Sequence, residues 1–457
     1  MTSCGHVKNW QHLHIIYIEM PQRGIMEGVM RKHKTLILYF AIFLSLLTLS
    51  GVVAATIMDK NPEEEDRTGL EEDEISLTED NTTPANDETT SADDEKTLAD
   101  DNTTMETYDD PDTISTSETP DEVDRSDSSD NPDSLIPAGP TILVFAGDIN
   151  LDEDSKPAAR YDREQKGILG GISPELIEEM NAADIMMLNN EFAYSTRGIE
   201  AQDKSYTFRA DPERVGILKE MGVDIVSLAN NHALDFGMDA LLDTFSTLED
   251  AGINYVGAGN NLERATSPVF YTLGGKKIAF LAASRVVFAM DWYASETSPG
   301  MIGTYDPSLI LDSIREAEAG SDFVVIYLHW GVERTDYPVE YQKELAMQYI
   351  DAGADAVIGC HPHVMQGLEF YKGKPIAYSL GNYWFNASKR ETGLLKLYLN
   401  SDDTLQVQLI PAMAEDTYTY LIQEEKEREA YFDFMEEISF QVDIDSEGYV
   451  TEHIENN

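Results

Sequence analysis

The sequence predicts an α/β fold in which helices cover β-sheets, and three observations support this prediction. From residue 137 onward, short apolar runs alternate with amphipathic stretches, which is the rhythm of a layered α/β domain. Glycine follows several of the amphipathic stretches, where it commonly ends a helix. Polar side chains gather just after the apolar runs, where ligands bind in open α/β sheets.

These patterns give an ordered set of expected elements. Strands are expected within residues 141–148, 183–192, 223–232, 277–284, 322–331, 355–364 and 374–385. Helices are expected within residues 173–183, 211–222, 237–252, 306–320 and 338–353. The carboxyl-terminal part, residues 416–457, contains a charged helix followed by a short strand, and we expect both to pack on the edge of the domain.

A long apolar segment lies near the amino terminus. Residues 36–58 carry no charge over about 23 positions, enough for a helix to cross a hydrocarbon layer of about 30 Å. Basic residues precede the segment, so the positive-inside rule places residues 1–35 in the cytoplasm and the rest of the chain outside. We therefore expect a single-pass signal anchor in the cell membrane. A cleaved signal peptide is the alternative, because Val53, Ala54 and Ala55 are small, but its apolar core usually spans only about 7–15 residues.

Residues 59–136 form a low-complexity acidic tract rich in Ser, Thr, Asn and Pro. Such a segment buries too little apolar surface to offset the entropy of ordering, and its like charges repel one another. The tract is therefore predicted to be a disordered stalk between the membrane span and the folded domain.

Composition excludes two classes of protein. The formal net charge of -53 leaves no basic footprint for a nucleic acid, so we expect no nucleic-acid partner. The two cysteines, Cys4 and Cys360, lie on either side of the apolar segment and exclude a disulfide framework. Cys360 is interpreted as a small buried residue.

Side chains able to bind metal ions follow five of the expected strands. They are Asp148, Asn150, Glu191, Asn231, His232, His329, His361 and His363. From residue 137 onward the chain has five histidines, and four of them belong to this set. A random scatter of histidines would rarely give this pattern.

Taken singly, these residues have ordinary structural explanations. Asp148 could cap a turn, Asn231 could stabilise a tight turn, and Glu191 could pair with an arginine. A single histidine after an apolar strand, such as His329, is more often a hydrogen-bonded core residue than a ligand. All of these explanations would have to hold at once, so the set as a whole favours a metal site.

Carboxylate, amide oxygen and neutral imidazole suit divalent Mn, Fe or Zn. His361 and His363 flank a proline, and on an extended segment their rings would point to the same side. The candidates exceed what one ion needs, so we expect a pair of divalent ions about 3.5–4 Å apart with one bridging carboxylate. His232 would then remain free to donate a proton to a leaving group.

Several motifs together resemble the CapA family of poly-γ-glutamate capsule biosynthesis, which belongs to the calcineurin-like metallophosphoesterase superfamily. The motifs, within residues 141–385, are FAGDINLD, NNEFAYS, YTFRADPE, VSLANNHALDFG, GINYVGAGNNLERA, LHWGVE and DAGADAVIGCHPHVMQGLEFYKGKPIAYSLGNYWF. The resemblance implies a metallophosphoesterase-like four-layer αββα sandwich of two mixed sheets. We place this domain at residues 137–415.

The resemblance also implies a role for each site residue. Asp148 matches the first metal-binding aspartate, His329 the next metal-binding histidine, and His361 with His363 the closing pair of ligands. Asn231 and His232 match the Asn-His pair, of which the histidine is the proton donor. In this chain Asn150 replaces a usual histidine ligand, and Glu191 replaces the usual bridging aspartate. Residues of the same motifs expected to line a substrate cleft are Arg209, Asn230, Trp330, Glu333 and Asn382.

Two functions follow from the resemblance. In the first, a metal-dependent hydrolase at the cell surface acts in the synthesis or export of poly-γ-glutamate, beside membrane subunits of capsule synthesis and export. In the second, a non-catalytic scaffold binds or guides poly-γ-glutamate or another acidic polymer, and the metal site is vestigial. The acidic chain would repel such a polymer unless a local basic groove or bound divalent ions screened the charge. A surface nucleotidase is disfavoured because the sequence offers no recognisable pocket for adenine.

Overall fold

The computed structural model describes residues 139–386 and 389–453. The expected cytoplasmic segment (1–35), membrane span (36–58) and acidic stalk (59–136) lie outside these residues. None of the helices that the structure describes has the length and apolar character needed to cross a bilayer. The described residues include every candidate for the metal site.

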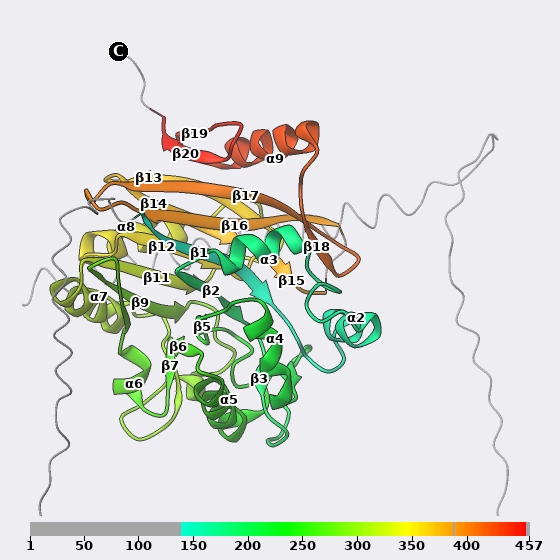
Figure 1. The fold of residues 1–457 in the computed structure, drawn as a ribbon. Helices are drawn as coiled ribbons and strands as arrows, with labels where there is room; N and C mark the ends of the chain where they lie inside the picture. The colour runs from blue at the N-terminus through cyan, green and yellow to red at the C-terminus, as the bar shows by residue number, and fades with distance from the viewer. Residues whose placement is uncertain (1–138, 387–388, 454–457) are drawn as a thin grey trace, which may run out of the picture. The chain divides into compact units, whose positions relative to one another are not determined.

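The larger of the two main sheets is mixed and contains the first strand of the domain. Its strands are β1 (Thr141–Ile149), β2 (Ile185–Asn190), β5 (Ile225–Ser227), β6 (Asn254–Val256), β15 (Asn382–Trp384), β16 (Arg390–Leu399), β17 (Leu405–Glu415), β18 (Tyr418–Leu421), β19 (Val442–Ile444) and β20 (Tyr449–Glu452). Their spatial order is β19-β20-β17-β16-β1-β2-β5-β6, with β15 beside β1 and β18 beside β17. Strands β1, β2, β5 and β6 are parallel, whereas β16 and β17 run antiparallel (Figure 1).

The second main sheet is also mixed. Its strands are β8 (Val269–Leu273), β9 (Lys276–Ser284), β11 (Phe323–His329), β12 (Ala356–Cys360), β13 (Met365–Tyr371) and β14 (Lys374–Leu380). They run in the order β13-β14-β12-β11-β9-β8, with four parallel strands in the centre and an antiparallel strand at each edge.

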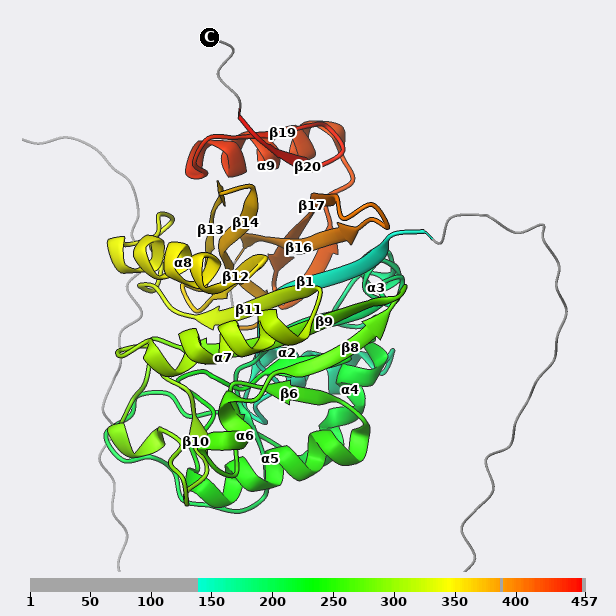
Figure 2. The same cartoon turned by 90° about the vertical axis from the view of Figure 1, so that its left-hand side faces the viewer.

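Helices cover the outer face of each main sheet. The helices are α2 (Lys156–Glu164), α3 (Pro174–Asn181), α4 (Val215–Glu220), α5 (Gly237–Ala251), α6 (Leu262–Thr266), α7 (Ser308–Gly320), α8 (Glu340–Ala352) and α9 (Glu425–Ile438). Apolar side chains of α3, α4 and α5 pack against β1 and β2, whereas those of α7 and α8 pack against β9, β11 and β12. Figure 2 shows α7 and α8 lying across the smaller sheet. Short elements complete the fold: β3 (Ala193–Tyr194), β4 (Arg209–Ala210), β7 (Ala258–Gly259), β10 (Gly300–Met301), and 3₁₀ turns at Pro212–Arg214 and Met290–Trp292.

The two main sheets pack face to face across a shared apolar core. Along β1 the side chains alternate, so that Leu143 and Phe145 point toward the smaller sheet and Val144 points toward the helices. The Phe145 and Phe280 rings meet across this core with centroids 6.5 Å apart. The Tyr327 hydroxyl donates a hydrogen bond of 2.7 Å to the Ala146 carbonyl oxygen and so links the two sheets. The predicted α/β sandwich of two mixed sheets is confirmed.

The carboxyl-terminal helix α9 closes one end of this core. Its buried residues Tyr431, Phe432, Met435 and Ile438 belong to the same apolar cluster as the facing strands. Strand β20 pairs with β17 and thereby extends the larger sheet. Figure 1 shows α9, β19 and β20 together beyond β17.

Near its carboxyl end, strand β1 lies very close to the backbone of Gly381, the residue before β15. The Asp148 backbone N–H donates to the Gly381 carbonyl oxygen at 2.9 Å, and the pairing of β1 with β2 shifts register between Phe145 and Asp148. A Cβ atom on Gly147 would lie only 1.9 Å from that same Gly381 oxygen. Only glycine therefore allows β1 to lie this close to β15, and the irregularity turns Asp148 toward the site.

Gly147→Ala is therefore expected to destabilise the protein by about 1–3 kcal/mol, because β1 and β15 must separate. The control is Gly216→Ala in α4, where an added Cβ meets nothing within 4 Å. That control should leave stability unchanged or raise it by about 0.5–1 kcal/mol. Thermal unfolding of the full-length protein measures both effects, and a Gly147→Ala midpoint equal to that of the wild type would contradict this packing.

Candidate metal centre

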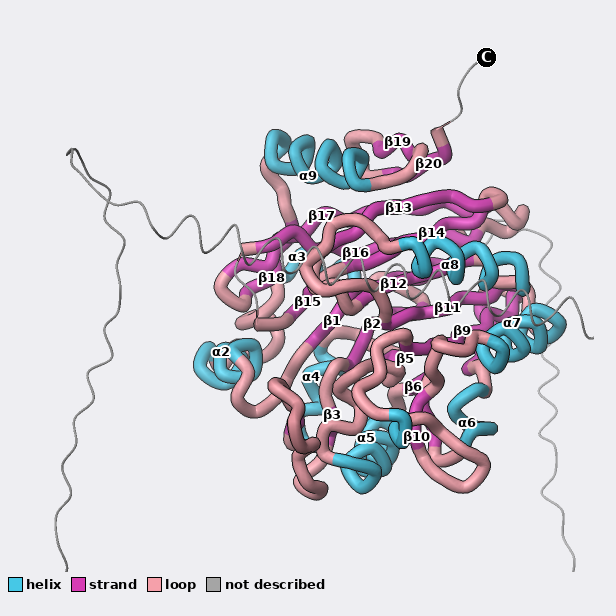
Figure 3. The backbone as a smooth tube through the Cα atoms, turned by 180° about the vertical axis from the view of Figure 1, so that it is seen from behind, coloured by secondary structure: helices cyan, strands magenta, loops and turns pink. Residues whose placement is uncertain are grey.

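The candidate ligands meet where strands of both sheets end. Asp148 lies near the end of β1, and Glu191 follows β2 directly. His329 is the last residue of β11, and His361 comes directly after β12. The carboxyl ends of these parallel strands bring the four side chains together, and loops gather around the ends of the strands (Figure 3). The four residues are almost completely buried.

Hydrogen bonds to both of its oxygens hold the Asp148 carboxylate in place. The Asn189 side-chain amide donates to Oδ1 at 2.8 Å, and the His361 backbone N–H donates to Oδ2 at 3.1 Å. His363 Nδ1 lies 3.6 Å from Oδ2. Burial raises the pKa of Asp148, and the nearby His363 and the hydrogen bonds oppose that rise.

The Glu191 carboxylate is buried without a hydrogen-bond donor among the described residues. Its side chain is inaccessible to solvent, and neither carboxylate oxygen has a hydrogen-bond partner among the described residues. Oε1 lies 3.6 Å from His329 Nε2 and 3.9 Å from His232 Nε2. Burial, together with the charge of Asp148, raises the pKa of Glu191 well above its ordinary value. A buried carboxylate without donors is costly unless a cation or a proton neutralises it.

Three imidazoles complete the centre, and two of them touch. His361 Nδ1 lies 3.0 Å from His329 Nε2, and the same His329 nitrogen lies 2.7 Å from Asn231 Oδ1. His363 Nδ1 lies 2.8 Å from Asn382 Oδ1. Burial lowers the pKa of His361 to about 3 and the pKa of His329 well below its ordinary value. Both rings are therefore neutral near pH 7, which is the form that binds metals.

The closing pair of histidines reaches the centre by a different route from the one expected. Strand β12 ends at Cys360, and both His361 (φ 95°) and His363 (φ 59°) have left-handed backbone conformations. The segment is a tight turn around Pro362 rather than an extended strand, so the extended-strand argument for two rings on one side was wrong. Non-glycine residues rarely adopt such conformations, and those that do cluster at functional sites.

Six potential ligands form two triplets. Asp148, His329 and Cys360 each offer an atom within 4.8 Å of the other two, and the same holds for Glu191, His361 and His363. Two adjacent triplets with a buried carboxylate in each suit two divalent cations. The orphaned Glu191 oxygens are the observation that fits bound cations most closely, because no described residue donates a hydrogen bond to them and the Lys204 charge acts on them only from beyond hydrogen-bond distance.

Asn150 stands apart from these triplets. Its side-chain oxygen accepts a hydrogen bond of 2.8 Å from the Asp152 backbone N–H, so it caps its own loop. Its side-chain nitrogen is buried without a partner among the described residues. The resemblance places a ligand at this position, and the hydrogen bond from Asp152 occupies one of the two lone pairs of the amide oxygen.

Two residues of the centre were not among the predicted site residues. Cys360, interpreted as packing, has its Sγ 3.3 Å from His329 Nδ1. Burial raises its pKa well above the ordinary value, so without a cation it is a thiol. Asn189 binds Asp148, lies 3.3 Å from His329 Nδ1 and accepts a hydrogen bond of 3.0 Å from Asn230. Cys360 directly precedes the predicted ligand His361, and Asn189 lies two residues before the predicted ligand Glu191, so both positions could have been identified from sequence.

His232 is positioned by contacts to Nδ1, the ring nitrogen that does not face Glu191. Its Nδ1 lies 2.6 Å from Asp235 Oδ2, and the Phe208 ring stacks on it with centroids 4.1 Å apart. Lys204 forms a buried ion pair with Asp235 and lies 3.0 Å from His232 Nδ1. Burial lowers the pKa of His232 to about 4, so the ring is neutral near pH 7. Neither Lys204 nor Asp235 was predicted, although Asp235 lies in the same motif, three residues after His232.

Two of the predicted substrate residues touch the centre. Asn382 contacts His363 as described above, and it is almost fully buried. Asn230 donates to Asn189 and to the Asn190 carbonyl oxygen at 2.9 Å, and its own oxygen accepts from the His232 backbone N–H at 3.0 Å. The Asn230 side chain therefore uses these bonds to hold the backbone around the ligands.

The other predicted substrate residues differ in their positions. Trp330 has no solvent exposure and donates to the Tyr378 carbonyl oxygen at 2.9 Å, inside the core beneath α7 and α8. It therefore offers no surface to a substrate, which corrects its assignment to the cleft. Glu333 is exposed on the loop after β11. Arg209 is half-buried, with its guanidinium 4.0 Å from the centre of the Phe236 ring.

Comparison with known protein families gives a match that covers this set of residues. The sequence model of bacterial capsule synthesis protein PGA_cap matches residues 142–387, more than half of the chain. The matched range includes all six residues of the two triplets. The chain belongs to the PGA_cap family. The resemblance to CapA proteins is thereby confirmed.

Curated relatives of this PGA_cap chain come from several bacteria. It is 34% identical over 213 residues to the PGA biosynthesis protein CapA of Bacillus subtilis (strain 168), covering 46% of this chain and 56% of that one. It is 32% identical over 222 residues to the capsule biosynthesis protein CapA of Bacillus anthracis, covering 47% and 54%. A probable polyglutamine synthesis accessory protein of Mycobacterium tuberculosis is 30% identical over 213 residues, covering 45% and 56%. The chain thus spans about half the length of the relatives it matches.

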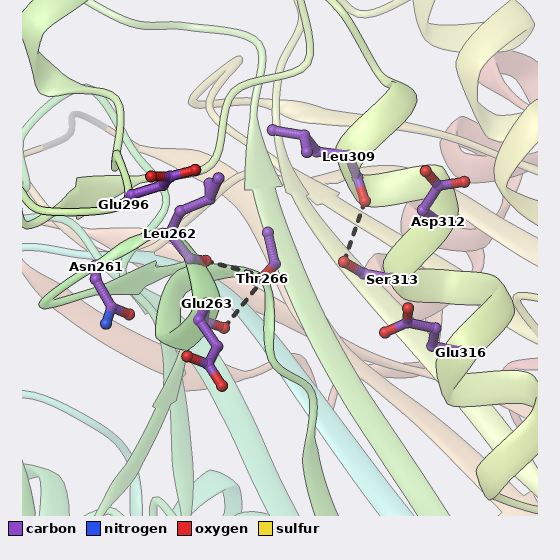
Figure 4. A pocket seen from close by; sticks show the side chains of 9 residues that line it. All are labelled: Asn261, Leu262, Glu263, Thr266, Glu296, Leu309, Asp312, Ser313 and Glu316. Atoms are coloured by element: carbon purple, nitrogen blue, oxygen red, sulfur yellow. Dashed lines mark hydrogen bonds between the residues drawn. The ribbon is translucent and has the colours of Figure 1, made fainter.

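A separate pocket of about 380 Å³ lies on the PGA_cap domain beside α6 and α7. Figure 4 shows its lining, which includes the carboxylates of Glu263, Glu296, Asp312 and Glu316. No candidate metal ligand lines this pocket. Its charge would repel an acidic polymer, so the strand-end centre is the better candidate for the functional site.

His361→Ala is expected to lower the affinity of the PGA_cap centre for Mn²⁺ or Zn²⁺ by about tenfold or more, because it removes an imidazole from one triplet. His453→Ala is the matched control: this histidine is exposed near the carboxyl terminus and contacts Asp443 at 2.9 Å. Equilibrium dialysis of the full-length protein with each metal measures the affinities. Equal affinities for wild type and His361→Ala would contradict the assignment.

Proposed function

We propose that this chain is a cell-surface protein of poly-γ-glutamate capsule synthesis or export whose PGA_cap domain is a metal-dependent hydrolase of the calcineurin-like metallophosphoesterase type. The family match and the names of the curated relatives support the pathway. The observation that carries the hydrolase assignment is Glu191, a fully buried carboxylate without a donor that lies among neutral imidazoles.

The donor set fits two divalent ions such as Mn, Fe or Zn. Carboxylate and imidazole are ligands that all three metals accept, and the two triplets supply them at adjacent positions. Asp148 and His329 would hold one ion, whereas Glu191, His361 and His363 would hold the other. The chemistry that such ions supply is Lewis acidity, which activates a nucleophile at neutral pH and stabilises negative charge on the reacting group.

The residues around His232 prepare it for proton transfer. With its proton on Nδ1 the neutral ring donates to the Asp235 carboxylate at 2.6 Å, while the Lys204 ammonium donates to Asp235 and to the Asn231 carbonyl oxygen. Nε2, which faces Glu191 at 3.9 Å, is then the atom that takes up a proton and releases it. The stacked Phe208 ring covers His232 and excludes water from this side.

The second candidate is a non-catalytic scaffold that binds or guides the polymer with a vestigial metal site. Asn150 supports this alternative, because an amide stands where a histidine ligand is usual and its oxygen also accepts a hydrogen bond from its own loop. A centre with one weaker ligand would hold its cations less tightly. The complete closing pair, His361 and His363, favours the hydrolase.

The proposal includes an anchor in the cell membrane. The apolar segment at residues 36–58 would place the amino terminus in the cytoplasm and the PGA_cap domain outside. The proposed partners are poly-γ-glutamate or another acidic polymer and the membrane subunits of capsule synthesis and export. No nucleic acid is expected, because the chain carries a formal net charge of -53.

His232→Ala is expected to reduce kcat by about 10²–10⁴-fold, because it removes the proton-transfer group, while leaving bound metal nearly unchanged. The assay uses the full-length protein with Mn²⁺ and a generic phosphodiester, followed by γ-glutamyl oligomers. His453→Ala serves again as the control and should keep full activity.

Two outcomes separate the candidates. Bound metal with activity lost in His232→Ala supports the hydrolase. A wild-type protein that binds γ-glutamyl polymer but holds no metal and hydrolyses neither substrate would refute the hydrolase and leave the scaffold.

A further inference from the structure

The backbone of Arg285 contacts a residue of the metal centre. It follows the last residue of β9, and its backbone N–H donates a hydrogen bond of 2.8 Å to the carbonyl oxygen of His329. One guanidinium nitrogen donates to the Thr304 carbonyl oxygen at 2.7 Å. The other N–H donors of the guanidinium have no acceptor among the described residues.

Aromatic rings hold this guanidinium in position. Its carbon lies 4.1 Å from the centre of the Tyr305 ring and 5.1 Å from that of the Tyr341 ring. The Tyr341 hydroxyl in turn exchanges hydrogen bonds with the backbone of Gly331, two residues after His329. The half-buried cation is therefore fixed beside the loop that leaves the centre, and little entropy is lost when it binds a ligand.

The guanidinium lacks a negative partner. Of the acidic side chains that the structure describes, none lies within 4.0 Å of it, although the chain is strongly acidic. A rigid cation without a negative partner is a group that an anionic ligand would complete.

Two further arginines stand on loops next to residues of the centre. Arg334 donates its backbone N–H to the Pro362 carbonyl oxygen, between the two closing histidines. Arg209 follows Phe208, the residue that stacks on His232. Like Arg285, neither forms an ion pair within the described residues. Three loops next to residues of the centre thus each carry an arginine without an ion pair, in contrast to the acidic pocket beside α6 and α7.

We infer that Arg285 binds a carboxylate group of the acidic polymer next to the metal centre. The inference rests on the proposed function and adds to it a residue that selects the substrate. A planar guanidinium binds a carboxylate with two parallel hydrogen bonds. The local positive charge also explains how a chain of net charge -53 accepts a polyanion.

The test is binding of γ-glutamyl oligomers to the full-length protein, measured by calorimetry with and without Mn²⁺. Arg285→Gln should weaken binding by about tenfold or more. The affinity of Arg285→Lys should lie between those of the wild type and Arg285→Gln, because lysine keeps the charge but cannot form two parallel hydrogen bonds to a carboxylate. Arg264→Gln is the matched control: this arginine also contacts one carbonyl oxygen (Tyr255, 3.0 Å) and one ring (4.2 Å) without an ion pair, but lies on α6. The control should bind as the wild type does.

Three results would overturn the inference. If the wild type binds the oligomers and Arg285→Gln binds them equally well, the assignment of Arg285 fails and the proposed function stands. Tighter, Arg285-dependent binding of inorganic polyphosphate would replace carboxylate by phosphate as the ligand. If the wild type binds no oligomer at all, although it holds metal, the proposed role in polymer handling fails as well. Thermal unfolding of each variant checks that it is folded.

Discussion

Glu191 is the residue that places the strongest constraint on this structure. Its carboxylate is fully removed from water and has no hydrogen-bond donor among the described residues, and it lies next to Asp148, a second buried carboxylate. Holding such a group ionised costs several kcal/mol unless cations neutralise it. The imidazoles of His329 and His361 are neutral under the same burial and cannot serve as those cations. Bound divalent ions would resolve the conflict, and the other features of the site follow from the need to hold them.

The two-sheet fold is what brings these groups together. Asp148 and Glu191 come from parallel strands of the larger sheet, whereas His329 and His361 come from parallel strands of the smaller sheet. Facing sheets place the carboxyl ends of both strand sets at one edge. The approach is close because Gly147 has no side chain. On loops next to residues of this edge, Arg285, Arg334 and Arg209 form no ion pair within the described residues.

Much of this fold could be predicted from sequence, because long apolar runs such as those of β9 and β11 determine buried parallel strands. The run at 223–232 was expected as a long strand but forms only Ile225–Ser227, since the amides and His232 that follow turn into the site. The paired strands β16 and β17 were not predicted, although their alternating apolar residues belong to the core. The long-range pairing of β16 with β1, which positions β17 beside it, is set by the tertiary fold rather than by any local motif.

Some residues of the candidate site were predicted from the sequence and others were not. Residues at strand ends were found because position and chemistry coincide there, as for Asp148 and His329. Asn150 was expected as a metal ligand, and its side-chain oxygen accepts a hydrogen bond from the backbone of its own loop. Such a local hydrogen bond cannot be predicted from the sequence alone. Trp330 lies in a site motif but points into the core, because adjacent residues of a strand face opposite sides.

The central claim is that two divalent ions occupy the centre formed by Asp148, Glu191 and the three histidines. X-ray absorption spectroscopy of the Mn-loaded full-length protein tests it most directly, because the fine structure reports both the ligands and the distance between ions. The account predicts a shell that contains imidazole and carboxylate ligands and a metal–metal distance of about 3.5–4 Å. A shell without imidazole, or no metal retained after buffer exchange, would contradict it.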